Sequence, residues 1–162
     1  MVIQIATRFL ASNQIPARLA MVSQSQLAKN ASRSFVIMGD GELQEGSNWE
    51  AAMFAGHRKL TNLIAVIDRN GFQQGSPTSK TNELDPLDKK FESFGWEVRV
   101  VGGHDYAALH KALTDPQTKP RAVIAQTTKG KGVDFMEGKA EWHHKVPSAE
   151  QYEAALLQLG QQ

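Results

Sequence analysis

The chain has 162 residues, of which 41% are hydrophobic, and this suits one globular domain with a single core. Its 18 basic and 17 acidic residues nearly cancel, so composition gives no case for binding nucleic acid or an anionic membrane, and no apolar run reaches the length of a membrane span. The lack of cysteine excludes disulfides and cysteine–metal sites and fits a reducing compartment, so we expect a cytoplasmic protein.

The first 38 residues differ from the rest in charge. They contain no acidic residue and carry four basic ones: Arg8, Arg18, Lys29 and Arg33. An acid-poor start with arginine and serine is also typical of an organellar transit peptide, but we favour a helix over residues 17–29 that packs on a sheet. We therefore expect an atypical segment over residues 1–38, helical plus a first strand, and one α/β domain over residues 35–162.

Two short apolar runs, residues 35–38 and 63–67, have the length and composition of buried strands. The residues between them predict a helix over 47–60, which begins at a Ser-x-x-Glu capping box formed by Ser47 and Glu50. Two strands joined by a helix of this length form a parallel pair with a right-handed crossover.

Predicted helices and strands continue to alternate towards the C-terminus. Residues 73–82 predict a loop because they are rich in Gly, Ser, Thr and Pro. A helix then runs from Asp85, as its N-cap, to Gly95, as its terminator. Residues 96–101 predict a strand, and His104 is expected to cap the helix that follows it.

The last part of the chain predicts one more strand and one more helix. Arg121–Gln126 is an apolar strand, and a polar loop follows it over residues 127–147. The final helix starts at Ser148, where Gln151 completes a capping box. Strands near residues 35, 63, 97 and 122 with helices between them predict an α/β fold, an open parallel sheet with helices on both faces.

Polar residues follow two of these strands at the point where each strand ends. Asp40 lies just past the first apolar run and Asn70 just past the second. The carboxyl ends of parallel strands are where open α/β sheets bind ligands, and carboxylate and amide oxygens suit Mg²⁺. Gly39 and Gly41 leave the backbone bare, so a phosphate can approach it near the positive end of a helix. The sequence therefore predicts a magnesium–diphosphate site, with Asp40 as a surface residue of the strand tip.

These residues carry a resemblance to a known family. Gly39-Asp40-Gly41 followed by Asn70 resembles the thiamine diphosphate signature. The longer string Gly-Asp-Gly-Glu-Leu-Gln-Glu-Gly-x-x-Trp-Glu-Ala-Ala, with Asp-Arg-Asn-Gly after it, resembles the N-terminal section of transketolase. The glycine-rich turn and the early histidines that the family places before this string are missing, which we interpret as a truncation, an altered reading frame or divergence.

The resemblance implies a two-carbon ketol transfer between sugar phosphates, as in the pentose phosphate pathway, with thiamine diphosphate and Mg²⁺ as cofactors. It assigns the metal to Asp40, Asn70 and the backbone carbonyl of Phe72, and the diphosphate to the Gly39–Gly41 turn. His143, in Glu-Trp-His-His-Lys, matches a family histidine that contacts the diphosphate and faces the reacting centre. Glu45 matches a glutamate of the family's carboxylate network across the subunit interface, and Glu50 is a weaker candidate for it.

Each of these residues also has an ordinary structural explanation. An aspartate after a strand is commonly a cap, and Asn70-Gly71 is a common turn pair. Glu45 and Glu50 suit a solvated helix start, where the helix dipole favours acidic residues. His143 and its neighbour His144 are also consistent with surface residues on a loop.

The glutamate that activates the cofactor's aminopyrimidine in this family lies on a second, pyrimidine-binding domain, and nothing in these 162 residues resembles that domain. We therefore expect a subunit that needs a second chain for activity, in an assembly that forms a homodimer. Two alternatives stay open: a non-catalytic remnant of a transketolase, and a subunit of another thiamine enzyme, such as 1-deoxyxylulose-phosphate synthase or a dehydrogenase.

Overall fold

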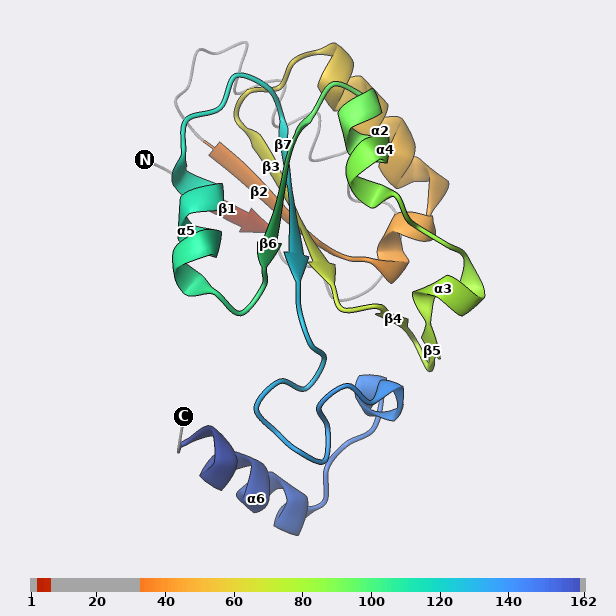
Figure 1. Ribbon diagram of the computed structural model, residues 1–162, viewed down its shortest axis with the longest axis vertical. Coiled ribbons are helices and arrows are strands. Elements are labelled where there is room, and N and C mark those ends of the chain that lie inside the picture. The colour runs from red at the N-terminus through yellow and green to blue at the C-terminus, as the bar shows by residue number, and fades with distance from the viewer. Residues whose placement is uncertain (1–2, 7–32, 161–162) are drawn as a thin grey trace.

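The computed structural model describes residues 3–6 and 33–160, which form one five-stranded parallel sheet with helices on both faces (Figure 1). The strand order across the sheet is β1-β2-β3-β7-β6. These strands span Ile3–Ala6 (β1), Arg33–Gly39 (β2), Leu63–Arg69 (β3), Glu97–Gly102 (β6) and Arg121–Gln126 (β7). The predicted parallel α/β sheet is confirmed, and so are its four strands near residues 35, 63, 97 and 122.

The N-terminal segment contributes a strand that the sequence did not predict. β1 lies at the edge of the sheet, parallel to β2, with Ile3 beside Arg33 and Ala6 beside Val36. We expected the first strand only at residue 35, and this was wrong because a four-residue edge strand has too few positions to show a period. The predicted helix over residues 17–29 lies outside the described residues.

One face of the sheet is covered by α2 (Gly46–His57) and α4 (Leu87–Ser93). The predicted capping box at Ser47 is wrong, because the chain turns helical earlier. Asp40 caps a 3₁₀ helix, η1 (Gly41–Gln44), and α2 begins directly after Glu45, whose side chain makes no capping hydrogen bond. Ser47 therefore lies inside the first turn of α2.

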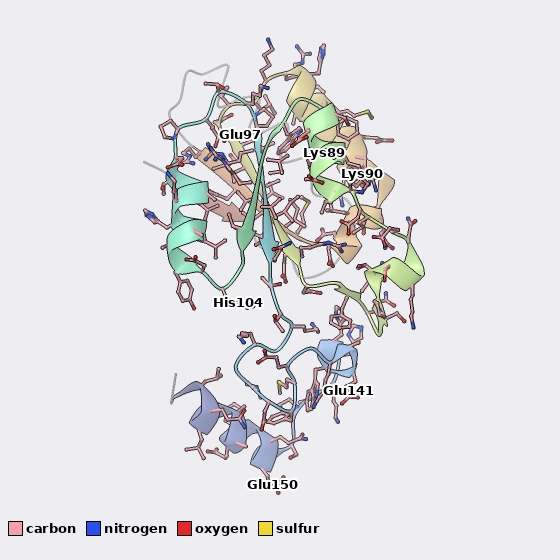
Figure 2. The ribbon with its side chains drawn as sticks, in the orientation of Figure 1. Lys89, Lys90, Glu97, His104, Glu141 and Glu150 are labelled. Atoms are coloured by element: carbon pink, nitrogen blue, oxygen red, sulfur yellow. The ribbon has the colours of Figure 1, made fainter. Side chains whose placement is uncertain are left out.

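The opposite face is covered by α5 (Tyr106–Thr114), which packs on β6 and β7. Asp105 caps this helix by accepting a hydrogen bond from the Ala108 N–H at 3.0 Å, so the expected cap by His104 is wrong. His104 lies in the turn between β6 and α5 (Figure 2). Its Nε2 accepts a hydrogen bond from the Thr128 N–H at 2.8 Å, which ties this turn to the segment after β7.

The segment between β3 and α4 is more regular than the predicted loop. It contains a small hairpin, β4 (Phe72–Gln73) and β5 (Ser76–Pro77), followed by the short helix α3 (Thr78–Thr81). Asp85 was predicted to cap α4, but Pro86 takes that position and the Asp85 carboxylate reaches Arg69 instead. Gly95, with φ +85°, follows the last turn of α4, as predicted for its terminator.

The C-terminal part extends away from the sheet beyond the carboxyl end of β7 (Figure 1). It contains the 3₁₀ helix η2 (Ala140–His143) and the helix α6 (Ala149–Leu159). The capping box of Ser148 and Gln151 is confirmed. None of the helices in the described part of the chain has the length and apolarity that a bilayer crossing requires.

The aromatic cluster under α4 should carry much of the stability of this core. Phe91 is 2% exposed, and its ring centroid lies 5.5 Å from Trp49 and 5.4 Å from Trp96. We expect Phe91→Ala to lower the free energy of unfolding by about 3–5 kcal/mol, because it removes buried apolar area and leaves a cavity. Urea denaturation checks this against Tyr106→Ala, a control at an 86% exposed position, and equal losses in the two variants would contradict it.

Candidate functional site

The candidate site lies where the carboxyl ends of β2 and β3 meet. The parallel register pairs Met38 with Ile67 and Gly39 with Asp68, so the segments that leave the two strands begin side by side. The Asp40 N–H continues the pairing by donating to the Asp68 carbonyl at 3.2 Å. The sheet itself therefore brings Asp40 next to the turn that contains Asn70, as the sequence predicted.

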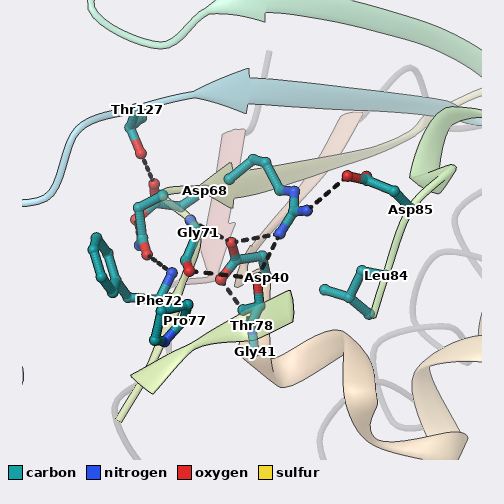
Figure 3. A network of polar contacts seen from close by, with 12 residues as sticks. Asp40, Gly41, Asp68, Gly71, Phe72, Pro77, Thr78, Leu84, Asp85 and Thr127 are labelled. Atoms are coloured by element: carbon teal, nitrogen blue, oxygen red, sulfur yellow. Dashed lines mark hydrogen bonds and ion pairs between the residues drawn. The ribbon is translucent and has the colours of Figure 1, made fainter. Parts of the chain in front are cut away.

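Asp40 is a buried carboxylate with three donors (Figure 3). Its Oδ1 accepts a hydrogen bond from the Gly41 N–H at 2.8 Å, and its Oδ2 accepts one from the Gly71 N–H at 2.7 Å. The Arg69 Nη1 donates to the same Oδ2 at 3.1 Å and forms an ion pair with it. The expectation that Asp40 is a surface residue is wrong: its exposure is 0%. Burial is tolerated because every donor that a charged oxygen needs is present.

Asn70 is oriented by hydrogen bonds on both sides of its amide. Its Oδ1 accepts from the Phe72 N–H at 2.9 Å, which makes the turn after β3. Its Nδ2 donates to Asp68 Oδ2 at 3.2 Å, and the other Asp68 oxygen accepts the Thr127 hydroxyl hydrogen. Since Thr127 directly follows β7, its contact with Asp68 links β3 to β7 (Figure 3). The two hydrogen bonds of the Asn70 amide fix which way its carbonyl oxygen faces.

The two glycines beside Asp40 differ in their surroundings. A Cβ added to Gly39 would meet nothing within 4 Å, so the backbone there is open to a ligand. A Cβ added to Gly41 would lie 2.6 Å from Gln73 Cγ, so only glycine allows the β4 strand this close. The Gln73 Oε1 is buried and has no hydrogen-bond partner in the described part of the chain. Gln73 therefore occupies the space in which a side chain of residue 41 would lie.

The remaining predicted residues are not joined to Asp40 and Asn70 by hydrogen bonds between described residues. Glu45 is half-buried at the start of α2, and Glu50 is exposed on that helix. His143 is exposed at the end of η2, with its ring edge-to-face with His144 at 4.6 Å. Partial desolvation, together with the charges of Lys129 and His144, lowers the pKa of His143, so the neutral ring is favoured at neutral pH.

The donor set at the two strand tips suits a hard cation. Asp40 Oδ1 and Asn70 Oδ1 each accept one hydrogen bond from a described residue, so each keeps a lone pair that can coordinate a metal. Within residues 3–6 and 33–160, no group of three or more His, Cys, Asp or Glu side chains gathers to hold a metal ion. A cation bound here would therefore need further oxygen ligands, from the backbone and from an anion that binds together with it.

Sequence reasoning missed the residues that hold Asp40 and Asn70 in place. They are the charged and hydroxyl side chains Asp68, Arg69, Thr78 and Thr127. A signal was present in the order Asp68-Arg69-Asn70, since successive strand residues point to opposite faces. That alternation directs Asp68 towards Asn70 and Arg69 towards Asp40.

Comparison with known proteins finds matches that cover most of the chain. Residues 8–162 match the thiamine diphosphate-binding domain of transketolase. The chain is 44% identical over 147 residues to one subunit of the apulose-4-phosphate transketolase of Actinobacillus succinogenes, covering 90% of this chain and 53% of that protein. It is 42% identical over 117 residues to human transketolase, covering 72% of this chain and 19% of that protein.

Solved structures of transketolases have the same fold as this chain. A crystal structure of transketolase from Campylobacter jejuni superposes with a TM-score of 0.78 at 31% identity, covering 91% of this chain and 24% of the other. The chain spans about half the length of the apulose-4-phosphate transketolase subunits that it matches, 53% of the one from Actinobacillus succinogenes and 52% of the one from Phocaeicola vulgatus. The match to transketolase favours this family over the other thiamine enzymes that the sequence left open.

Removal of the Asp40 carboxylate should be costly. Asp40→Ala leaves two backbone N–H groups without their acceptor and removes the buried carboxylate with which the Arg69 guanidinium pairs. We expect it to lower the free energy of unfolding by about 3 kcal/mol. Urea denaturation measures this against Asp88→Ala, which removes a partly exposed carboxylate from α4. Losses of the same size in both variants would contradict the network.

The lowered pKa of His143 gives a second prediction. Lys129 disfavours the protonated ring by charge repulsion, so Lys129→Gln should raise the pKa of His143 towards its ordinary value. An NMR titration of the His143 ring protons follows this directly, with Lys111→Gln on α5 as a control that removes a lysine elsewhere. A pKa that stays unchanged or falls in Lys129→Gln would show that the charge of Lys129 does not act on His143.

Proposed function

The chain belongs to the transketolase family through its thiamine diphosphate-binding domain, and from this premise we propose that it is one part of a split transketolase. In this proposal it binds Mg²⁺ and the diphosphate of thiamine diphosphate for ketol transfer between sugar phosphates. The observation that carries the proposal is the buried Asp40 carboxylate, held against the Asn70–Phe72 turn at the carboxyl end of a parallel sheet.

The donor set fits magnesium. Asp40 Oδ1, Asn70 Oδ1 and the Phe72 carbonyl are hard oxygen ligands, and the first two keep a lone pair beyond the hydrogen bonds described above. We propose these three as the protein ligands of Mg²⁺. Because Mg²⁺ prefers six oxygens and the site supplies one carboxylate, the diphosphate oxygens and water would complete the set.

The glycines bring the diphosphate close to the backbone. Gly39 leaves open space where its side chain would stand, which supports an approach of the diphosphate from that side. The Gly41 N–H already donates to Asp40, and Gln73 lies against Gly41. An approach of the diphosphate to Gly41 from the side of Gln73 would require the flexible Gln73 side chain to turn away. The Gln73 Oε1 has no hydrogen-bond partner among the described residues, so this movement would break no hydrogen bond to that oxygen.

His143 and Glu45 are the residues we propose for catalytic roles. Thiamine diphosphate supplies the electron sink for carbon–carbon cleavage. A neutral His143 ring suits a group that accepts a proton near the reacting centre, and the direction of its pKa supports this assignment. Glu45 would act across the interface with a second chain, and its carboxylate is not engaged in capping α2.

A second chain completes the proposal. The relatives that match this chain at 44% and 40% identity are each named as one subunit of a transketolase, which supports a partner chain here too. We propose that this partner carries the pyrimidine-binding domain, that the assembly forms a homodimer, and that its substrates are sugar phosphates of the kind found in the cytoplasmic pentose phosphate pathway. A cofactor held only by its diphosphate would leave its reacting rings in water, where fixed donors stabilise charge poorly.

The chain alone should therefore lack transketolase activity. We expect no ketol transfer from xylulose 5-phosphate to ribose 5-phosphate by the purified chain, and weak magnesium-dependent binding of thiamine diphosphate by calorimetry. Addition of a transketolase subunit that carries the pyrimidine domain should create activity and tighten cofactor binding. Robust turnover by the chain alone would overturn the proposal. A chain that gains neither cofactor binding nor activity with the partner would instead be a non-catalytic remnant.

A further inference from the structure

Arg69 is the one positively charged group that the described contacts place on the proposed metal ligand Asp40. Its guanidinium donates to Asp40 Oδ2 at 3.1 Å and to Thr78 Oγ1 at 3.0 Å. It also donates to Asp85 Oδ2 at 3.2 Å and lies 3.9 Å from Glu83 (Figure 3 shows the contact with Asp85). Acidic groups on both sides thus hold the guanidinium against the site.

The acidic partners of Arg69 differ in how strongly their charge depends on Arg69 for stabilisation. The side chains of Asp85 and Glu83 are 64% and 53% exposed, so water solvates them without an ion pair. The Asp40 side chain is 1% exposed, and Arg69 is its only cationic partner among the described residues. A buried carboxylate without a cation is costly. The charge of Arg69 therefore matters chiefly to Asp40.

Arg69 is not required to orient Asp40. The Gly41 N–H holds Oδ1 and the Gly71 N–H holds Oδ2, so each oxygen keeps a backbone donor when the guanidinium is removed. Thr78 likewise keeps its contact with the Gly71 carbonyl. What Arg69 adds at Asp40 is a full positive charge, and arginine cannot lose that charge by deprotonation.

We propose that Arg69 is a resident counter-cation that controls when a metal can bind. A divalent cation on Asp40 Oδ1 shares one carboxylate with the guanidinium on Oδ2, and two like charges at this range repel. The free cation is therefore bound weakly, and it enters the site together with the anionic diphosphate, which offsets the repulsion. This inference rests on the proposed function, because it requires the metal to bind at Asp40.

The test uses Mn²⁺ as the probe and the full chain without thiamine diphosphate. Electron paramagnetic resonance measures free and bound Mn²⁺. We expect Arg69→Met and Arg69→Gln, which remove the charge, to bind Mn²⁺ at least about tenfold more tightly than the unchanged chain. Arg69→Lys keeps a positive charge and should restore weak binding. Arg99→Met is the matched control, since Arg99 pairs with Glu97 on the edge strand β6.

Thermal stability gives a second readout with a defined sign. Without metal, Arg69→Gln should have a lower melting temperature than the unchanged chain, because Asp40 loses its counter-charge. Added Mn²⁺ should raise the melting temperature of Arg69→Gln more than that of the unchanged chain, because a ligand stabilises the state that it binds more tightly. A merely structural role of Arg69 would lower the melting temperature in both conditions by the same amount.

An Asp40→Asn variant separates the possible failures. If Asp40→Asn leaves Mn²⁺ binding unchanged, the metal does not bind at Asp40, and both the proposed metal site and the role of Arg69 are overturned. If Asp40→Asn abolishes Mn²⁺ binding but Arg69→Met and Arg69→Gln bind Mn²⁺ no more tightly, the metal site stands and only the counter-cation role is overturned. Tighter Mn²⁺ binding in Arg99→Met as well would also overturn the counter-cation role, because the effect would then follow from the net charge of the chain.

Discussion

The burial of one carboxylate sets the geometry of this end of the sheet. Asp40 follows β2 with no exposed surface, and a buried charge is tolerated only when donors satisfy it. The donors come from three places: the start of η1 at Gly41, the turn after β3 at Gly71, and the Arg69 side chain. None of these segments can move far without leaving the charge unpaired. The strand tips are therefore fixed relative to each other before any ligand binds.

The sheet was predictable because its signals are local and repeated. Apolar runs of strand length, separated by segments of helix length, define β2, β3 and β7, and the crossover rule makes them parallel. The edge strand β1 was missed because its four residues are too short a run to distinguish a strand, and its crossover to β2 lies outside the described residues. The errors at helix starts have two causes. The predicted caps His104 and Asp85 make tertiary contacts instead, with Thr128 and Arg69, and α2 begins before Ser47 because it directly follows η1.

The position of the candidate site could be predicted from the sequence, but the contacts that hold its residues in place could not. Asp40 and Asn70 are the predicted ligands because a polar residue directly after a buried strand lies at the edge where parallel sheets bind ligands. Their burial and their partners depend on register and on side-chain direction, which composition does not reveal. Thr127 is 59 residues from Asp68 in the chain and meets it only because β7 lies beside β3. Long-range contacts of this kind follow from the fold and cannot be read from a motif.

Asp40 and Asn70 are supported by different chemistry, and this difference bears on function. Asn70 is held by neutral and acidic groups, the Phe72 N–H and the Asp68 carboxylate, which add no positive charge near a cation. Asp40 is held by two backbone N–H groups and also by Arg69, and Arg69 adds a positive charge. Backbone donors alone would suffice for orientation, so the guanidinium changes the charge of the site rather than its shape. A preorganised set of oxygens lowers the ordering cost of binding, and a fixed positive charge raises the cost of a bare cation. Together they favour a cation that arrives with an anion, which is the form in which a magnesium–diphosphate cofactor is presented.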